Sequence, residues 1–405
     1  MTDLETRAAP PGNALRRAAP ALLGYAAVRA LGLLALALWS AARDKSAYTL
    51  LTARWDSLWY TRVAELGYGY EVRLPNGDVH SNLAFFPLLP WLERGAAAVT
   101  PLSYADAGFA VSLLASLAAA WGIFAVADHV YGRRAGVCAV LVWALLPVGI
   151  VQSMAYSESL FTALAAWSLY AVLTGRWLTA GTLAALAGLT RPVGLAVVAA
   201  VWVTGIASFV RNRSTAPAQG ARDPEHAPST PADRAGGGAP AWRRALGMLL
   251  APLGAAGYVL WVGHRTGKGP LGYLDVQAGW RNGFDGGYAF ARFVADKFTS
   301  FPSALAGLGL IVGVGLVVWL YVVCVRQGQP LPLLVYAGVV TALALCASSY
   351  FGSKPRLLLP AFPLLLPLAL ALARLRTSRS ALVTAGVALA SAVYGAFWLN
   401  GSGPP

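Results

Sequence analysis

The chain has 405 residues, of which 57% are hydrophobic and 12% are charged, whereas a soluble domain carries about 25% charged residues. This composition excludes a soluble globular enzyme, a disordered protein and a nucleic-acid binder, even though the formal net charge is +14. Long unbroken apolar runs exclude an outer-membrane barrel. We therefore predict an all-α polytopic membrane protein whose basic excess lies in its cytoplasmic loops.

A membrane-spanning helix needs about 20 apolar residues, and this length rule predicts about eleven spans after a polar tail at residues 1–19. The predicted spans are residues 20–40, 105–127, 136–152, 157–174, 177–190, 193–210, 244–263, 302–325, 331–349, 357–373 and 380–399. Arg191 and Pro192 separate two of them, so a single broken helix with a re-entrant turn is an alternative for residues 177–210.

Four further segments complete the predicted organisation around the helical stretches 105–210, 242–263 and 302–399. Residues 41–104 and 264–301 form two long loops, and residues 400–405 form a tail. Residues 211–241 are rich in Pro, Gly and Ala, which predicts a disordered linker. Because Lys and Arg mark the cytoplasmic side, their distribution places the N-terminus and the linker inside, and both long loops and the C-terminus outside.

The first long loop contains the most informative pattern. Apolar residues recur at helical spacing over residues 55–66, which predicts an amphipathic helix in the membrane interface. Asp56 then lies at the start of this helix, at the boundary between water and membrane, where it can serve as a general base or only as an N-cap. After a polar turn at residues 74–78, Pro87 and Pro90 predict a second interfacial helix that begins near Pro87.

Several charged residues lie at the predicted outer edge of the membrane. Arg191 adjoins a proline-broken helix, where a charge is costly and often functional, although an arginine can also snorkel to the interface. Lys354 and Arg356 flank Pro355, and they either bind phosphate or form an ordinary positive loop. Glu158 begins a span and either contacts substrate or belongs to a helix cap made by Ser157.

The second long loop and two isolated residues add weaker candidates. Gln277, Trp280 and Asn282 form either a sugar platform or a membrane-interface anchor. His80 lies outside and can assist, although a lone histidine is usually structural or solvated. Arg29 is the one clear charge within a predicted span, where it pairs with Glu158 or reaches an interface.

Taken in order, these segments resemble the PIG-V-type mannosyltransferases, that is, GPI mannosyltransferase 2 and its bacterial relatives. The resemblance rests on RWDSLWY (54–60), AELGY (64–68), NLAFFPLLPWL (82–92), AYSESLF (155–161), TRPVG (190–194), Val276-Gln277 with Trp280 and Gly283-Phe284, and KPRLLLPAFP (354–363). In the last motif the family has tyrosine where this chain has Leu357.

This resemblance implies a GT-C fold and a bacterial plasma-membrane enzyme whose active site faces outside. It implies transfer of mannose from a polyprenyl-phosphate-mannose donor to a lipid-linked or glycan acceptor. Asp56 would be the catalytic base. The residues expected to contact substrate are Trp55, His80, Glu158, Arg191, Gln277, Trp280, Lys354 and Arg356.

The chemistry agrees with these residue types. One carboxylate can deprotonate an acceptor hydroxyl, direct attack inverts the sugar carbon, and arginine can hold the departing phosphate through two hydrogen bonds. No nucleotide leaves, so we expect no metal and no other cofactor. One alternative is a lipid or sugar transporter or flippase, which predicts mid-span charges and internal repeats. A second is a non-catalytic partner of another glycosyltransferase.

Overall fold

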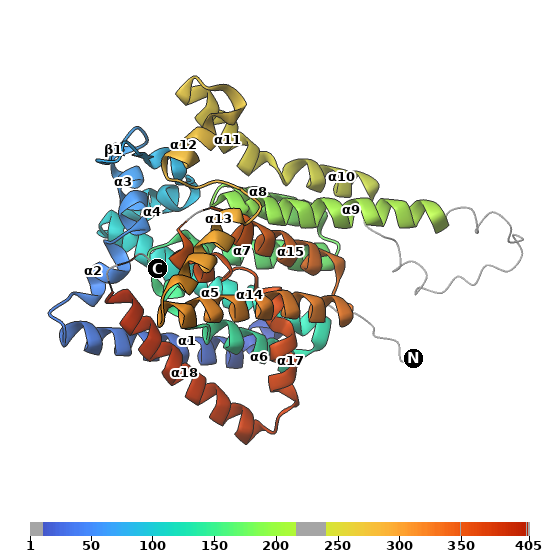
Figure 1. The fold of residues 1–405 in the computed structure, drawn as a ribbon. Helices are drawn as coiled ribbons and strands as arrows, with labels where there is room; N and C mark the ends of the chain where they lie inside the picture. Colours follow the sequence, from blue (N-terminus) through green and yellow to red (C-terminus); the bar gives the residue numbers. More distant parts are fainter. Residues whose placement is uncertain (1–10, 216–239, 349, 402, 404–405) are drawn as a thin grey trace, which may run out of the picture.

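The computed structural model describes residues 11–215, 240–348, 350–401 and 403, and it shows a bundle of helices (Figure 1). The helices are α1 (Pro11–Ala41), α2 (Ala47–Thr52), α3 (Asp56–Leu66), α4 (Leu88–Val99), α5 (Tyr104–Tyr131), α6 (Arg133–Ala144), α7 (Ser157–Leu173), α8 (Trp177–Gly188), α9 (Leu195–Thr215), α10 (Ala241–Leu250), α11 (Leu253–Thr266), α12 (Gly272–Gly279), α13 (Tyr288–Asp296), α14 (Ser303–Arg326), α15 (Leu331–Cys346), α16 (Lys354–Leu357), α17 (Leu366–Arg374) and α18 (Thr377–Leu399). Short 3₁₀ turns join several of them, among them η2 (Pro147–Ser153), η3 (Pro192–Gly194), η7 (Phe351–Ser353) and η8 (Phe362–Leu365).

The helices of the bundle have the lengths and apolar composition of membrane-spanning helices. Among the described residues, six helices are long and apolar enough to cross a bilayer. Two bent pairs raise the number to eight: α6 with η2, bent by 90°, and η7–α16 with η8–α17, bent by 76°. These spans confirm the predicted all-α membrane fold. Helices α7, α8 and α15 are apolar but shorter, so the count of eleven spans stays a prediction.

The element boundaries differ from the predicted ones in several places, and the predicted span 244–263 is divided into α10 and α11. Helix α1 begins at Pro11, inside the predicted polar tail. Helix α9 continues to Thr215 and so takes the first residues of the predicted linker, while residues 216–239 lie outside the described part of the chain. Helices α8 and α9 are separate and pack against each other, with Arg191 in the turn between them, so the broken-helix alternative is wrong.

The first long loop is folded. Helices α3 and α4 lie where the two interfacial helices were predicted. Between them, strands β1 (Glu71–Arg73) and β2 (Val79–Ser81) form an antiparallel hairpin that pairs Val72 with His80. The polar turn closes this hairpin, with the backbone N–H of Leu74 donating to the carbonyl of Asp78. Figure 1 shows the hairpin and α3 beside α12 of the second long loop, and residues of α12 contact β2.

The central core is made largely of small side chains. Helices α5 and α7 lie side by side, and α5 also packs against α1 and α6. Gly122 of α5 lies so close to Ala166 of α7 that an added Cβ would meet the alanine methyl at 2.9 Å. Small residues let transmembrane helices approach closely, which strengthens their van der Waals contact. This packing supports the turn before α7 that carries part of the candidate site.

That turn depends on a buried arginine. The 90° bend between α6 and η2 removes backbone donors that a continuous helix would supply. Arg29 of α1 is 7% exposed and donates to the carbonyls of Ala144 and Gly149 at the bend. The pairing with Glu158 considered for Arg29 is therefore wrong. The charge of Arg29 is here compensated by two buried backbone carbonyl groups.

We predict that Arg29→Met lowers thermal stability. Methionine fills similar space but cannot donate, and each buried carbonyl left unpaired costs about 1–3 kcal/mol. The thermal unfolding midpoint of the detergent-purified protein should fall by several degrees. Arg17→Met is the control, because Arg17 is half-exposed in its ion pair with Asp128 and exposed pairs contribute about 0–1 kcal/mol. Equal midpoints for the two variants would contradict the role assigned to Arg29.

Candidate active site

Four charged side chains from distant parts of the sequence meet at one end of the bundle. The Arg356 guanidinium lies 2.8 Å from a carboxylate oxygen of Asp56 and 3.2 Å from Glu158. Arg191 contacts the same Glu158 oxygen at 2.5 Å. Glu158 is 1% exposed and Asp56 is 25% exposed. Two carboxylates thus balance two guanidinium groups, and Asp56 is the member most open to a substrate.

The backbone before α3 positions Asp56. Trp55 has a φ of +55°, a region that non-glycine residues rarely adopt, and it turns the chain abruptly into the helix. Arg54 stacks over the Trp55 ring at 4.1 Å. The backbone N–H of Asp56 faces the hydroxyl of Tyr156 at 3.4 Å. Strain of this kind persists only where the surroundings enforce it, and it concentrates at functional sites.

Helix starts also position Glu158 and Arg191. Glu158 occupies the first turn of α7, where the helix dipole favours a carboxylate. Arg191 precedes Pro192, which holds it in an extended conformation and ends α8. The Arg191 guanidinium also donates to the Ser157 hydroxyl at 3.2 Å. Neither predicted cap is observed, since Trp55 and Tyr156 occupy the N-cap positions and neither helix has a side-chain capping hydrogen bond.

The two cations of the KPRLLLP segment have different surroundings. Arg356 points into the ionic cluster and lies over the Tyr156 ring at 5.2 Å. Lys354 donates instead to the carbonyls of Ala344 and Ala347, each at 2.7 Å, at the end of α15. The structure therefore brings Arg356 together with Arg191, whereas Lys354 binds backbone groups outside the cluster.

Two hydroxyl groups also belong to the cluster: that of Ser157, which the sequence analysis considered only as a helix cap, and that of Tyr60, which it did not single out. The Tyr60 hydroxyl lies 2.7 Å from the Ser157 hydroxyl, which Arg191 also contacts. Burial raises the pKa of Tyr60, so its hydroxyl stays protonated at neutral pH. Tyr60 follows Asp56 by four residues, a spacing that puts both on one helix face. This spacing from Asp56 is the sequence signal that could have identified Tyr60 as a member of the cluster.

An aromatic cluster adjoins the charged one. Phe85 contacts the Tyr60 ring edge-on at 5.2 Å and stacks on Trp59 at 5.6 Å. Trp280 of the second loop meets Trp59 edge-on at 4.9 Å, and His80 stacks on Trp280 at 4.0 Å. Burial lowers the pKa of His80, against the opposing effect of the nearby Asp78 carboxylate. The two long loops thus form one surface beside Asp56.

The remaining candidates support this surface. Trp280 donates to the carbonyl of Ser81 at 3.0 Å, which attaches α12 to the hairpin. Gln277 donates to the Tyr273 hydroxyl and accepts from Asn282, so its amide belongs to a structural network. Trp55 packs against the main core beside Asp56. The arrangement offers one accessible carboxylate, two arginines and an aromatic wall, which suits an anionic donor that carries a sugar.

Comparison with known proteins agrees with this geometry. Residues 40–213 match the sequence model of the family described as Mannosyltransferase (PIG-V). This match confirms the resemblance inferred from the motifs, and its range includes Asp56, Glu158 and Arg191. It ends before Arg356. No curated protein gave a significant match.

Two solved structures are similar to this chain. The crystal structure of ArnT from Cupriavidus metallidurans bound to undecaprenyl phosphate aligns with a TM-score of 0.51 and 15% identity, over 89% of this chain and 61% of that one. The apo form of the same protein aligns with a TM-score of 0.48 and 17% identity, over 80% and 55%. The chain therefore spans less than two thirds of the length of ArnT. The likeness to the bound form confirms the predicted GT-C fold.

Proposed function

We propose that this chain is a membrane glycosyltransferase that moves mannose from a polyprenyl-phosphate-mannose donor to a lipid-linked or glycan acceptor. The observation that carries the proposal is a partly exposed Asp56 paired with Arg356, which converges with Arg191 on one buried glutamate. The match to the mannosyltransferase family supports the reaction class. The ArnT structure that holds undecaprenyl phosphate supports a polyprenyl-phosphate donor on this fold.

In this proposal Asp56 is the general base. Its carboxylate takes the proton of the acceptor hydroxyl while that oxygen attacks the anomeric carbon of mannose. The bond between this carbon and the phosphate oxygen breaks, and the phosphate keeps the electron pair. A single displacement inverts the anomeric centre, so a β-linked donor gives an α-mannoside. At 25% exposure Asp56 is open enough to meet an acceptor and enclosed enough to be held in position.

Arg191 and Arg356 are proposed to hold the phosphate as its charge develops. Guanidinium groups bind phosphate oxygens through two parallel hydrogen bonds, and they are most effective where water is excluded. Both arginines are largely buried, at 14% and 9% exposure. Glu158 contacts both guanidinium groups, and so we assign it a positioning role rather than a chemical one.

The aromatic surface of Trp59, Trp280 and His80 is proposed to contact the sugar or the acceptor. Aromatic faces pack against the apolar side of a sugar ring while neighbouring polar groups bind its hydroxyls. This surface adjoins Tyr60 through Phe85, and the contact between Trp59 and Trp280 joins the two long loops.

The transporter alternative loses its main support. Its strongest sequence feature was the mid-span charge of Arg29. Arg29 instead binds the carbonyls of a helix bend, whereas the ion pairs of the cluster gather at one end of the bundle.

The first prediction concerns Asp56. Asp56→Asn keeps the shape of the side chain and removes the base, so transfer from labelled polyprenyl-phosphate mannose in proteoliposomes should fall by about 10²–10⁴-fold. Asp56→Glu should recover little, because the added methylene displaces a positioned carboxylate. Donor binding by both variants should persist.

The matched control is Asp106→Asn. Asp106 is a partly exposed helix-start carboxylate bound to Ser103 and Tyr48, outside the ionic cluster, so this change should leave transfer unaltered. Near-normal transfer by Asp56→Asn would reject the proposed base and leave Glu158 as the next candidate.

The second prediction concerns Arg191. Arg191→Lys keeps the charge but loses the planar fork that binds phosphate through two hydrogen bonds. The donor KM should rise about tenfold, corresponding to about 1.4 kcal/mol, while the acceptor KM changes little. Lys354→Arg is the comparison, because Lys354 binds backbone carbonyls outside the cluster. An unchanged donor KM and rate in Arg191→Lys would remove Arg191 from the phosphate site.

The third prediction tests the proposed orientation, with the site on the extracytoplasmic side. Asn76→Cys in the hairpin turn and Gln327→Cys after α14 place thiols at exposed positions in segments predicted to lie on opposite sides. In a background without the three native cysteines, a membrane-impermeant maleimide added to intact cells should label position 76 but not 327. Labelling of both from outside, or the reverse pattern, would contradict the orientation.

A further inference from the structure

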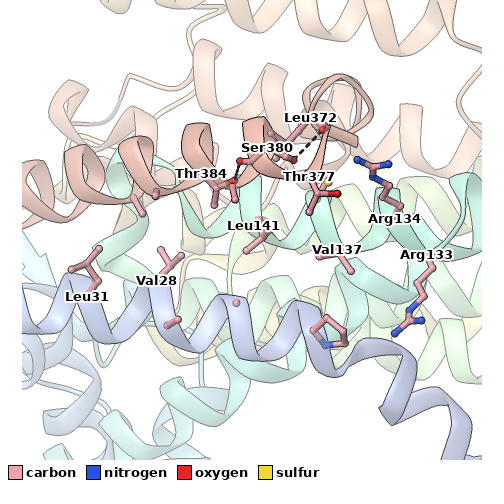
Figure 2. Close-up of a pocket in the computed structure, with 17 residues that line it drawn as sticks. Val28, Leu31, Arg133, Arg134, Val137, Leu141, Leu372, Thr377, Ser380 and Thr384 are labelled. Atoms are coloured by element: carbon pink, nitrogen blue, oxygen red, sulfur yellow. Dashed lines mark hydrogen bonds between the residues drawn. The ribbon is translucent and has the colours of Figure 1, made fainter. Parts of the chain in front are cut away.

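A second site-like feature lies away from the ionic cluster. A cavity of about 750 Å³ opens between α1, α6 and α18, with Leu372 of α17 at its edge. Figure 2 shows Val28 and Leu31 of α1 on one wall, Val137 and Leu141 of α6 behind, and Thr377, Ser380 and Thr384 of α18 on the opposite wall. The cavity is a long groove between helices that are themselves candidate membrane spans.

The groove narrows toward one end because α1 and α18 converge there. Trp39 meets Phe397 edge-on at 6.2 Å, and the Asn400 amide donates to the Ser40 hydroxyl at 3.1 Å. Toward the start of α18 the lining comes instead from α6 and from Leu372 of α17. This end, opposite the convergence, is lined by the exposed Arg133 and Arg134 and is the open end of the groove.

The walls of the groove are mostly apolar, and two of their hydroxyl groups are bonded to backbone carbonyls. Most of the lining side chains are aliphatic. The two hydroxyls drawn in Figure 2 with dashed bonds face their own backbone: Ser380 donates to the carbonyl of Leu372 at 3.4 Å, and Thr384 donates to that of Ser380 at 2.7 Å. With these donors satisfied, the groove suits a hydrocarbon chain rather than a polar ligand.

The open end is strongly basic. Arg133 and Arg134 line it, and both are exposed. Arg133 donates to the carbonyl of Arg17 at 3.4 Å, and Arg134 donates to that of Leu375 at 2.5 Å. Such a bond uses one of the five N–H groups of a guanidinium, so each arginine is held in place and can still bind a phosphate. Arg374 and Arg376 flank the same end and add positive charge.

We propose that this groove binds an anionic phospholipid of the surrounding membrane. One acyl chain lies between α1 and α18, and the headgroup phosphate is held by Arg133 and Arg134. The combination of an apolar groove with two exposed guanidinium groups that flank its mouth matches the two parts of such a lipid. By the charge distribution, this end of the bundle is the cytoplasmic one.

The groove is distinct from the proposed donor site. Arg133 and Arg134 begin α6, whereas Tyr156 and Glu158 follow η2 at the far end of the same segment. The α6–η2 segment thus separates the two sets of arginines. The inference holds whether or not the transferase proposal is correct, since it concerns only lipid retention.

Native mass spectrometry of the purified full chain provides the test. Protein in detergent with equimolar dioleoyl phosphatidylglycerol and dioleoyl phosphatidylcholine should retain the anionic lipid at least fivefold more. The double variant Arg133→Gln, Arg134→Gln should abolish this preference. Ala385→Phe, which fills the groove and leaves its charge intact, should also reduce retention at least fivefold.

The matched control is Arg176→Gln with Arg326→Gln, which removes two exposed arginines at the same predicted side but outside the groove. This double variant should retain the anionic lipid as the wild type does. Equal loss in both double variants, or full retention in Ala385→Phe, would overturn the site. In a second mixture that contains equimolar undecaprenyl phosphate and dioleoyl phosphatidylglycerol, selective retention of undecaprenyl phosphate would overturn the assigned occupant.

Discussion

The candidate site depends on a balance of buried charge. Removing an ion from water costs several kcal/mol even after relaxation, and breaking a buried pair leaves an uncompensated charge. Glu158, at 1% exposure, is tolerable because Arg191 and Arg356 both contact it. Arg356 in turn is shared with Asp56. Four distant segments are thereby tied to one another, and the geometry of each depends on the others.

Breaks between helices position the charged residues of the cluster. Trp55 turns the chain into α3, the bend held by Arg29 leads to the start of α7, and Pro192 separates α8 from α9. At each break a charged side chain lies beside a helix end rather than along a lipid-facing surface. Irregular backbone at membrane depth is tolerated where protein buries it. The breaks are thus placed where the neighbouring helices can satisfy the freed backbone groups.

Much of this arrangement could be predicted from residue patterns. Apolar run lengths located the helices, and amphipathic spacing located α3 and α4, because both signals are local. The short hairpin was missed, since three-residue strands carry almost no periodicity. Asp56, Glu158 and Arg191 were recognised as candidates, but their partners depend on contacts across as many as 300 residues. Lys354 and Arg356 looked equivalent in sequence, and only the fold separates a cation bound to carbonyls from one bound to carboxylates.

The spread of the four charges along the chain bears on how the protein is made. Glu158 and Arg191 lie 33 residues apart in the sequence, so this pair can form early. Asp56 gains its partner only when Arg356 emerges, after most of the polypeptide is complete. Until then the nascent chain carries an exposed acidic residue at its first folded loop. The last helices to enter the membrane therefore complete a site that the first ones began.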